Sequence, residues 1–334
     1  MKHIIAGFTA AMLAVLCANA QTRTQTVALE KGWNAVWLEV QPQDATPQEV
    51  FNGVADIVAG YVKPVSEAQF VQNTEVNVQS LAGWKTWYAP HRADAPLSRL
   101  HRVGAGMGYL VHALEAAVVE VRGTVEGTDL KWTPNRFNLA GFTVAPQGGP
   151  TFRQLFEGSP AHNHNKIYRL ANGVWRQVLQ PDAEAPRPGE AFWIWCGGGS
   201  DWQGPLQVRA NSPMGIVLAG DLRAGLEFGN ASKVPLTFTM SLVVDGDNAE
   251  IPLAAMIKAV APDTAGFQAL VDVPVDFPAG AWTQAFPEYE PGDGVTLPLA
   301  LRVKDTPPGK HAGLLKVETD VGTVTWIPVH ATKE

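Results

Sequence analysis

The sequence GWNAV at residues 32–36 returns as RFNLA at residues 136–140, and these two stretches decide how most of the chain is interpreted. A second pair follows in the same order, with GMGYLV at 106–111 and GEAFWI at 189–194. The repeated positions carry aromatic, aliphatic and glycine residues, and none of them is a nucleophile, a general base or a metal ligand. Repetition of this kind is the sequence signature of a duplicated folding unit. The repetition predicts two modules that share one fold, and it indicates no catalytic or metal-binding site.

The helix-start signals support the same duplication. TPQE at 46–49 and TFRQ at 151–154 each place a threonine before a first helical turn and a Glu or Gln three residues later, which is the pattern of a capping box. We also expect Trp87 and Trp175 to be equivalent core residues of the two modules. The sequence therefore predicts β-rich modules at residues 27–127 and 130–209, each with one short helix.

A different pattern begins near residue 211. Residues 236–242 (LTFTMSL) and 295–303 (VTLPLALRV) alternate apolar and polar side chains, as half-buried strands do. We predict an antiparallel immunoglobulin-like β-sandwich at residues 211–332, with one helical stretch at 253–260. The whole chain is thus predicted to be mainly β, and residues 21–26 are expected to form a flexible lead.

The N-terminus predicts export. Residues 1–20 combine a basic start, an apolar run and a small-x-small site ending at Ala20, which are the features of a secretory signal peptide. No second apolar run is long enough for a transmembrane helix. Only Cys196 follows the predicted cleavage site, so an intrachain disulfide is not expected. The net charge of −7 and the lack of a Lys/Arg cluster argue against nucleic acid as a partner.

Two resemblances follow from these stretches. The GWNAV, GWKTWY and GMGYLV segments resemble a repeat of secreted bacterial surface and multidomain proteins that reads GWNLV…W…GxGYWV, over residues 27–209. The second copy departs from it, since Arg136 and Phe137 replace Gly-Trp. Residues 226–230, 235–242 and 308–315 resemble bacterial immunoglobulin-like domains. Both resemblances imply a modular extracellular or periplasmic protein, and neither supplies a catalytic residue.

The eleven tryptophans are the first candidates for ligand contact. Aromatic faces bind sugars by stacking, but they also fill small β-rich cores. Four tryptophans lie outside the repeated apolar pattern and are the candidates for an exposed ligand-binding role, although packing is the interpretation that we favour for them: Trp37, Trp84, Trp195 and Trp202. Packing is the commoner use of aromatic side chains on strands.

Other candidate sites are weaker. His162 and His164 have a metal-like spacing, but zinc needs further ligands that the sequence does not indicate. Residues 245–250 offer calcium-like oxygens in a place where a hairpin turn is needed. Glu288 and Glu290 are expected to be solvated, since glycoside hydrolysis requires a set spatial separation of two carboxylates. Nucleotide-binding and metalloprotease motifs are missing from the sequence, so we predict no cofactor and no resident metal.

Three hypotheses about function follow. The first is a secreted, non-enzymatic protein that binds or assembles at the bacterial cell surface, with an extracellular protein or polysaccharide as partner. The second is a carbohydrate-binding protein that uses exposed tryptophans. The third is a hydrolase whose site is assembled from distant residues, which a cleft holding two carboxylates would favour.

Overall fold

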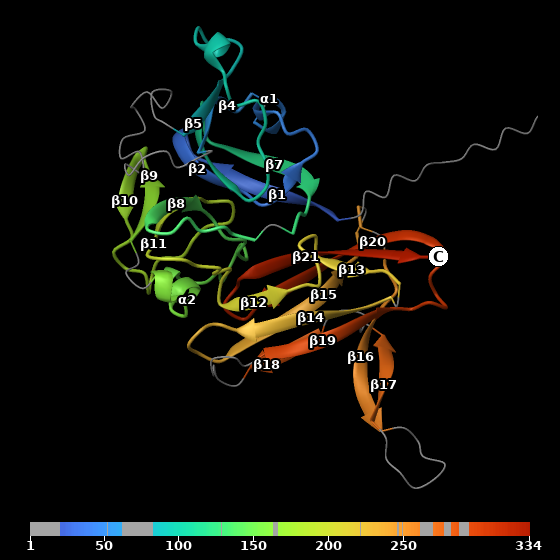
Figure 1. The fold of residues 1–334 in the computed structure, drawn as a ribbon. Helices are drawn as coiled ribbons and strands as arrows, with labels where there is room; N and C mark the ends of the chain where they lie inside the picture. Colours follow the sequence, from blue (N-terminus) through green and yellow to red (C-terminus); the bar gives the residue numbers. More distant parts are fainter. Residues whose placement is uncertain are drawn as a thin grey trace, which may run out of the picture.

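The protein is mainly β, as the sequence predicts (Figure 1). The computed structural model describes residues 21–51, 53–61, 83–127, 129–162, 166–220, 222–245, 247–248, 250–260, 270–276, 282–286 and 294–334. Five sheets and two short α-helices make up this described part. In Figure 1 the blue, teal and green strands occupy the top and left of the view, and the yellow to red strands occupy the lower right. The predicted signal peptide at 1–20 lies outside the described residues.

The N-terminal part contains two sheets, with strand orders β1-β7-β3 and β2-β6-β4-β5. Its elements are β1 (Thr22–Leu29), β2 (Gly32–Leu38), β3 (Gln41–Pro42), α1 (Pro47–Val50), β4 (Ala55–Tyr61), β5 (Trp84–Tyr88), the 3-10 helix η2 (Ala95–Leu97), β6 (Met107–Ala113) and β7 (Ala117–Thr124). Side chains alternate across a strand. On β2, Val36 and Leu38 therefore face a core shared with β1 and β7, whereas Ala35 and Trp37 face the opposite side.

Residues 21–26 do not form the flexible lead that we expected. Residues 22–26 belong to β1, which pairs with β7 from Thr22 opposite Thr124 to Leu29 opposite Ala117. The prediction was wrong because the buried residues here are polar and form hydrogen bonds with residues that are distant in the sequence. The Gln25 side chain donates to the carbonyl oxygen of Trp37 at 2.7 Å, and the Gln21 side chain donates to that of Val329 at 2.9 Å. A satisfied polar group can be buried at little cost, so hydropathy alone misses such a strand.

The next part of the chain forms a four-stranded sheet that repeats the order of the β2 sheet. Its elements are β8 (Arg136–Ala140), α2 (Phe152–Phe156), the 3-10 helix η3 (Pro160–His162), β9 (Ile167–Ala171), β10 (Val174–Gln177) and β11 (Phe192–Cys196). The strand order is β8-β11-β9-β10, which matches β2-β6-β4-β5 strand for strand. The register matches too, because Val36 pairs with Tyr109 and Ala140 pairs with Phe192.

This register changes which tryptophans correspond. Trp84 pairs with Tyr61 on β4, and Trp175 pairs with Leu170 on β9. In each sheet the partner of the tryptophan lies two positions after a residue that pairs with the equivalent position of the central strand, β6 or β11. The counterpart of Trp175 is therefore Trp84, and our alignment of Trp87 with Trp175 was wrong. The alignment was off by three residues because Trp84 and Trp87 lie on the same strand, β5, whereas its counterpart β10 carries one tryptophan.

The two similar sheets face each other across one aromatic core. Trp193 of β11 lies at its centre with 0% exposure, and its ring centroid is 6.3 Å from that of Trp84 and 6.1 Å from that of Trp175. Backbone bonds also join the sheets, since the Ala191 amide donates to the Ala35 carbonyl oxygen at 3.0 Å. Below we call the parts at 21–127 and 129–205 the first and second modules; they are joined by a continuous hydrophobic cluster.

The C-terminal part is a sandwich of two five-stranded sheets, ordered β12-β14-β19-β16-β17 and β13-β21-β20-β15-β18. The strands are β12 (Leu206–Arg209), β13 (Ile216–Leu218), β14 (Arg223–Asn230), β15 (Leu236–Val243), β16 (Leu253–Val260), β17 (Leu270–Asp276), β18 (Trp282–Phe286), β19 (Gly294–Leu301), β20 (Gly309–Thr319) and β21 (Val324–Lys333). The pairs are antiparallel except β13 with β21. Phe228 and Phe238 stack between the sheets at 4.4 Å.

Two details of the sandwich differ from prediction. Residues 253–260 form the strand β16 between β19 and β17, where we expected a helix. Leu253 and Ala254 are both buried, so the run lacks the alternation that would have separated strand from helix. The strand β12, which we placed at the end of the second module, pairs with β14 and begins the sandwich.

Both predicted helix caps are present. The Thr46 hydroxyl accepts from the Glu49 amide at 3.3 Å, and the Thr151 hydroxyl accepts from the Gln154 amide at 3.2 Å. The reciprocal bond of the capping box forms only in the second module, where the Thr151 amide donates to Gln154 Oε1 at 2.8 Å. In the first module Asp44 replaces Glu49 in this role, and the Thr46 amide donates to its carboxylate at 3.0 Å.

Removing either cap is expected to destabilise the protein modestly. Thr46→Ala and Thr151→Ala should each lower the free energy of unfolding by about 1 kcal/mol, because each leaves a helix N-terminal amide without its acceptor. Thermal unfolding of the two variants measures this. Melting temperatures equal to that of the wild type would show that the caps contribute nothing.

Candidate functional site

Three of the four tryptophans predicted as ligand platforms are used for packing. Trp37 and Trp202 are each 6% exposed and belong to the core of the two modules. The indole of Trp202 donates to the Leu155 carbonyl oxygen at 2.9 Å, which fixes its polar edge as well. Trp84 is half-buried, and its ring packs against Tyr61 and Trp193. A second sheet covers the faces of Trp37 and Trp202, so these two side chains are not exposed ligand platforms.

Trp195, like Trp84, is more accessible than Trp37 and Trp202. It is half-buried at the end of β11, with its ring 5.2 Å from that of Phe137. The ammonium group of Lys166 lies 5.5 Å from the Trp195 ring centroid, so a cation already occupies part of that face. A cation–π contact of this kind competes with a stacking ligand.

His162 is a core residue. It is 2% exposed, its Nδ1 lies 2.6 Å from the Ser159 hydroxyl, and its ring lies 4.3 Å from that of Trp132. Among the described residues no group of three or more His, Cys, Asp or Glu side chains could hold a metal ion. His164 lies outside the described residues. The metal interpretation of His162 was wrong because an imidazole enclosed by aromatic rings cannot reach an ion in solution.

The burial of His162 predicts a pH-dependent stability. Burial lowers the pKa of His162 from 6.5 to about 4. Between these values the unfolded chain binds a proton that the folded protein does not, so stability falls as pH falls from about 6.5 to about 4. Since each pKa unit is worth about 1.4 kcal/mol, we expect a loss of up to about 3 kcal/mol.

Urea unfolding at pH 7 and pH 4.5 tests this expectation. His162→Phe should lose this part of the pH dependence, whereas His101→Gln, at an exposed position, should keep it. An identical pH dependence in His162→Phe and the wild type would contradict the prediction.

The remaining weak candidates are structural or lie outside the described residues. Asp245 accepts bonds from the amides of Asp247 and Asn248, both at 2.8 Å, as in a turn. The Asn248 side chain in turn donates to the carbonyl oxygen of Thr22 and ties this turn to β1. Asp245 Oδ1 is thus engaged within the chain. Glu288 and Glu290 lie outside the described residues.

Sequence reasoning missed a buried ionic network in the first module. Asp56 is 5% exposed, and its two oxygens lie 2.6 Å from His112 Nδ1 and 2.6 Å from Arg92 Nη1. Burial alone would raise the pKa of Asp56, but the bonds from His112 and Arg92 outweigh it and lower the pKa. This network contains no nucleophile, and its carboxylate is fully engaged, so we assign it a structural role.

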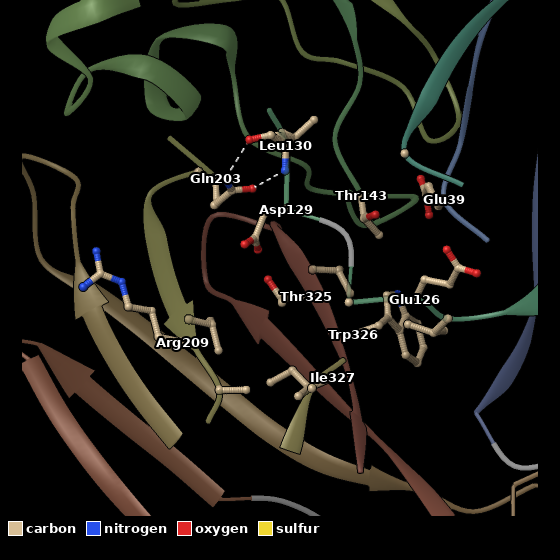
Figure 2. Close-up of a pocket in the computed structure, with 18 of the residues that line it drawn as sticks. Glu39, Glu126, Asp129, Leu130, Thr143, Gln203, Arg209, Thr325, Trp326 and Ile327 are labelled. Atoms are coloured by element: carbon tan, nitrogen blue, oxygen red, sulfur yellow. Dashed lines mark hydrogen bonds between the residues drawn. The ribbon is translucent and has the colours of Figure 1, made fainter. Parts of the chain in front are cut away.

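The main candidate site is a groove where the two modules meet the sandwich (Figure 2). We call it the junction groove; its volume is about 530 Å³. Its charged lining residues are Glu39, Glu126, Asp129, Asp201 and Arg209, and its aromatic residues include Trp37 and Trp326. Figure 2 shows the two bonds that fix one wall: the Leu130 amide donates to Gln203 Oε1 at 2.7 Å, and Gln203 Nε2 donates to the Leu130 carbonyl oxygen at 3.0 Å.

The other wall of the junction groove contains a buried ion pair. The Glu39 side chain is 5% exposed and accepts hydrogen bonds from Arg23, Thr143 and the Gly189 amide. Burial raises the pKa of Glu39, and these partners act against that rise. The Arg23 guanidinium lies 4.9 Å from the ring centroid of Trp326 on the sandwich. Glu39 and Arg23 thus connect both modules to the sandwich and give the groove a fixed wall.

A second cavity shares part of its lining with the junction groove. We call it the aromatic pocket; its volume is about 650 Å³. Its aromatic lining residues are Trp37, Tyr61, Trp132 and Phe137, and its charged residues are Asp129 and Lys131. Asp129 lines both cavities, so they are neighbours. No local motif could have indicated either site, because the lining residues come from segments far apart in the sequence.

None of the helices in the described part of the chain has the length and hydropathy needed to cross a membrane. No family model matches the sequence, and a search of curated proteins finds no match.

Solved structures with some similarity include the PapD-like domain 7 of human CEP192, with a TM-score of 0.24 and 10% identity over 39% of this chain and 85% of that one. Escherichia coli alpha-2-macroglobulin gives a TM-score of 0.21 and 10% identity over 94% of this chain and 33% of that one. The CupB6 tip adhesin from Pseudomonas aeruginosa gives 0.21 and 12%, over 94% and 91%. At TM-scores this low the similarities say nothing about function.

Proposed function

We propose that this protein is a secreted, non-catalytic binding or assembly protein of the bacterial cell surface, and that the junction groove is its contact site. The observation that supports this proposal most directly is the groove itself, which is lined by residues of both modules and of the sandwich. Among the described residues, Glu126 and Asp129 have neither a hydrogen-bond nor an ion-pair partner, so they are available to an external ligand. The sequence features of residues 1–20 support export, and the matching strand order of the two modules supports their origin by duplication.

The groove favours binding over hydrolysis. A carboxylate pair for glycoside hydrolysis needs one acid that is kept protonated by its environment and another that is free to react. Glu39 is the buried carboxylate of the groove, but Arg23, Thr143 and the Gly189 amide occupy its oxygens. The Asp201 side chain is 94% exposed and is open to solvent. This arrangement suits an acidic contact surface for a partner that carries positive charge or hydrogen-bond donors.

Charge reversal in the groove tests the proposal. Purified wild type and the double variant Glu126→Lys, Asp201→Lys would be cosedimented with cell envelopes of the source bacterium. The matched control is Glu115→Lys, Glu120→Lys, which makes the same change at exposed positions of the first module outside the groove. We expect the groove variant to lose at least about tenfold in affinity, the effect of about 1.4 kcal/mol. Envelope binding that is equal in all three proteins would contradict the proposal.

A further inference from the structure

We infer that the aromatic pocket binds a neutral pyranose unit of a polysaccharide, an inference that rests on the proposed binding function and specifies one class of ligand. The pocket is lined by residues of both modules and of the segment that connects them. Its volume of about 650 Å³ is within the range of about 300–1,000 Å³ that is usual for small-molecule sites. It is therefore large enough for a sugar ring and part of a neighbouring one.

Two aromatic side chains line the pocket from opposite sheets. Tyr61 ends β4 in the first module, and Phe137 lies near the start of β8 in the second. Both are half-buried, in contrast to Trp37 and Trp132, which are 6% and 8% exposed and belong to the core beneath them. Tyr61 and Phe137 are thus the aromatic lining residues that keep solvent-accessible surface, and we infer that the apolar C–H face of a pyranose packs against them.

These two rings are held in place by other aromatic residues. Tyr61 lies 5.3 Å from Trp84 and 5.4 Å from Trp193, measured between ring centroids. Phe137 lies 5.5 Å from Tyr168 and contacts it edge to face. A ring that packing already fixes loses little conformational entropy when a ligand binds, so the pocket is preorganised.

The charged residues of the pocket select the ligand class. Asp129 and Lys131 are exposed on the connecting segment and have no hydrogen-bond or ion-pair partner among the described residues. A carboxylate accepts and an ammonium group donates hydrogen bonds, and a sugar hydroxyl can do both. Their charges cancel, so the pocket favours a neutral ligand. A purely apolar ligand would desolvate both groups without giving them a partner.

Affinity gel electrophoresis of the full chain tests this inference. The probes are the neutral polysaccharides dextran, mannan, galactomannan and barley β-glucan, with alginate as an anionic comparison. We expect at least one neutral polysaccharide to retard the wild type. Phe137→Leu, which keeps an apolar side chain but loses the aromatic face, and the double variant Asp129→Asn, Lys131→Gln should each weaken that binding at least about tenfold.

The control is Trp33→Leu. Trp33 is the counterpart of Phe137 on β2, is also half-buried and does not line the aromatic pocket, so its loss should leave retardation unchanged. The Asp129 and Lys131 variant changes only exposed side chains, which keeps the test valid if Phe137→Leu unfolds. Retardation by none of the neutral polysaccharides, or equal retardation of wild type and both pocket variants, would overturn the inference. If the Glu126 and Asp201 variant nevertheless loses envelope binding, the proposed function stands and only the sugar assignment fails.

Discussion

Replacing Trp193 by alanine is expected to lower the free energy of unfolding by about 3–5 kcal/mol, the usual cost of truncating a buried tryptophan. Trp193 is fully buried and touches Tyr61 and Trp84 of the first module as well as Trp175 of the second. Since a domain is stable by only about 5–15 kcal/mol, this loss is a large share of the total. Because both modules supply the contacts, we expect both to be destabilised together.

The control for this prediction is Trp87→Ala. Trp87 is half-buried at the edge of the core that β2 shares with β1 and β7, so its truncation should cost less. Urea unfolding followed by far-UV circular dichroism gives the two free energies. A Trp193→Ala protein as stable as Trp87→Ala would show that Trp193 does not hold the sheets together.

A methyl group at Gly141 should destabilise the contact between the two modules. A Cβ built on Gly141 would lie 2.5 Å from the Cβ and Cγ of Trp37 and 2.6 Å from the carbonyl oxygen of Glu190. Real Cβ atoms do not approach other atoms this closely, and neither a Cβ nor a backbone oxygen can rotate away. Overpacking of a well-filled core typically costs about 1–3 kcal/mol and sometimes more, and we expect Gly141→Ala to reach the upper end of that range.

Gly199→Ala is the matched substitution in the same module. A Cβ on Gly199 would meet no atom within 4 Å, so this variant should unfold like the wild type. Differential scanning calorimetry compares the two. A Gly141→Ala protein that melts with Gly199→Ala would contradict the close approach of Trp37 to the second module.

The sequence correctly predicted the structural elements that depend on residues close to one another in the chain. The caps at Thr46 and Thr151 and the alternating strand β15 depend on neighbouring residues, and they form where the pattern placed them. The strand β1 was missed because Gln21 and Gln25 are buried through bonds to distant segments. The strand β16 was misassigned because tertiary pairing with β19 overrides the local preference of a largely apolar run that lacks strict alternation.

The candidate sites could not be predicted from local sequence patterns, for a related reason. Alternation shows that β2 has two faces, but it does not show that another sheet covers the face that carries Trp37. An aromatic residue on such a strand therefore looks like an exposed ligand platform. Conversely, no local sequence pattern indicated Asp129 or Trp326 as site residues, because only the packing of the modules on the sandwich brings them to one groove.

The measurement that tests the shared core most directly is hydrogen–deuterium exchange of the full chain with Trp175→Ala. Trp175 belongs to the second module and contacts Trp193 at 6.1 Å between ring centroids. If one core serves both modules, the amides of β4 and β6 in the first module should exchange faster together with those of β9 and β11. The strands β14 and β20 of the sandwich, which has its own core, should keep their protection. Faster exchange in β9 and β11 with unchanged protection in β4 and β6 would contradict the account.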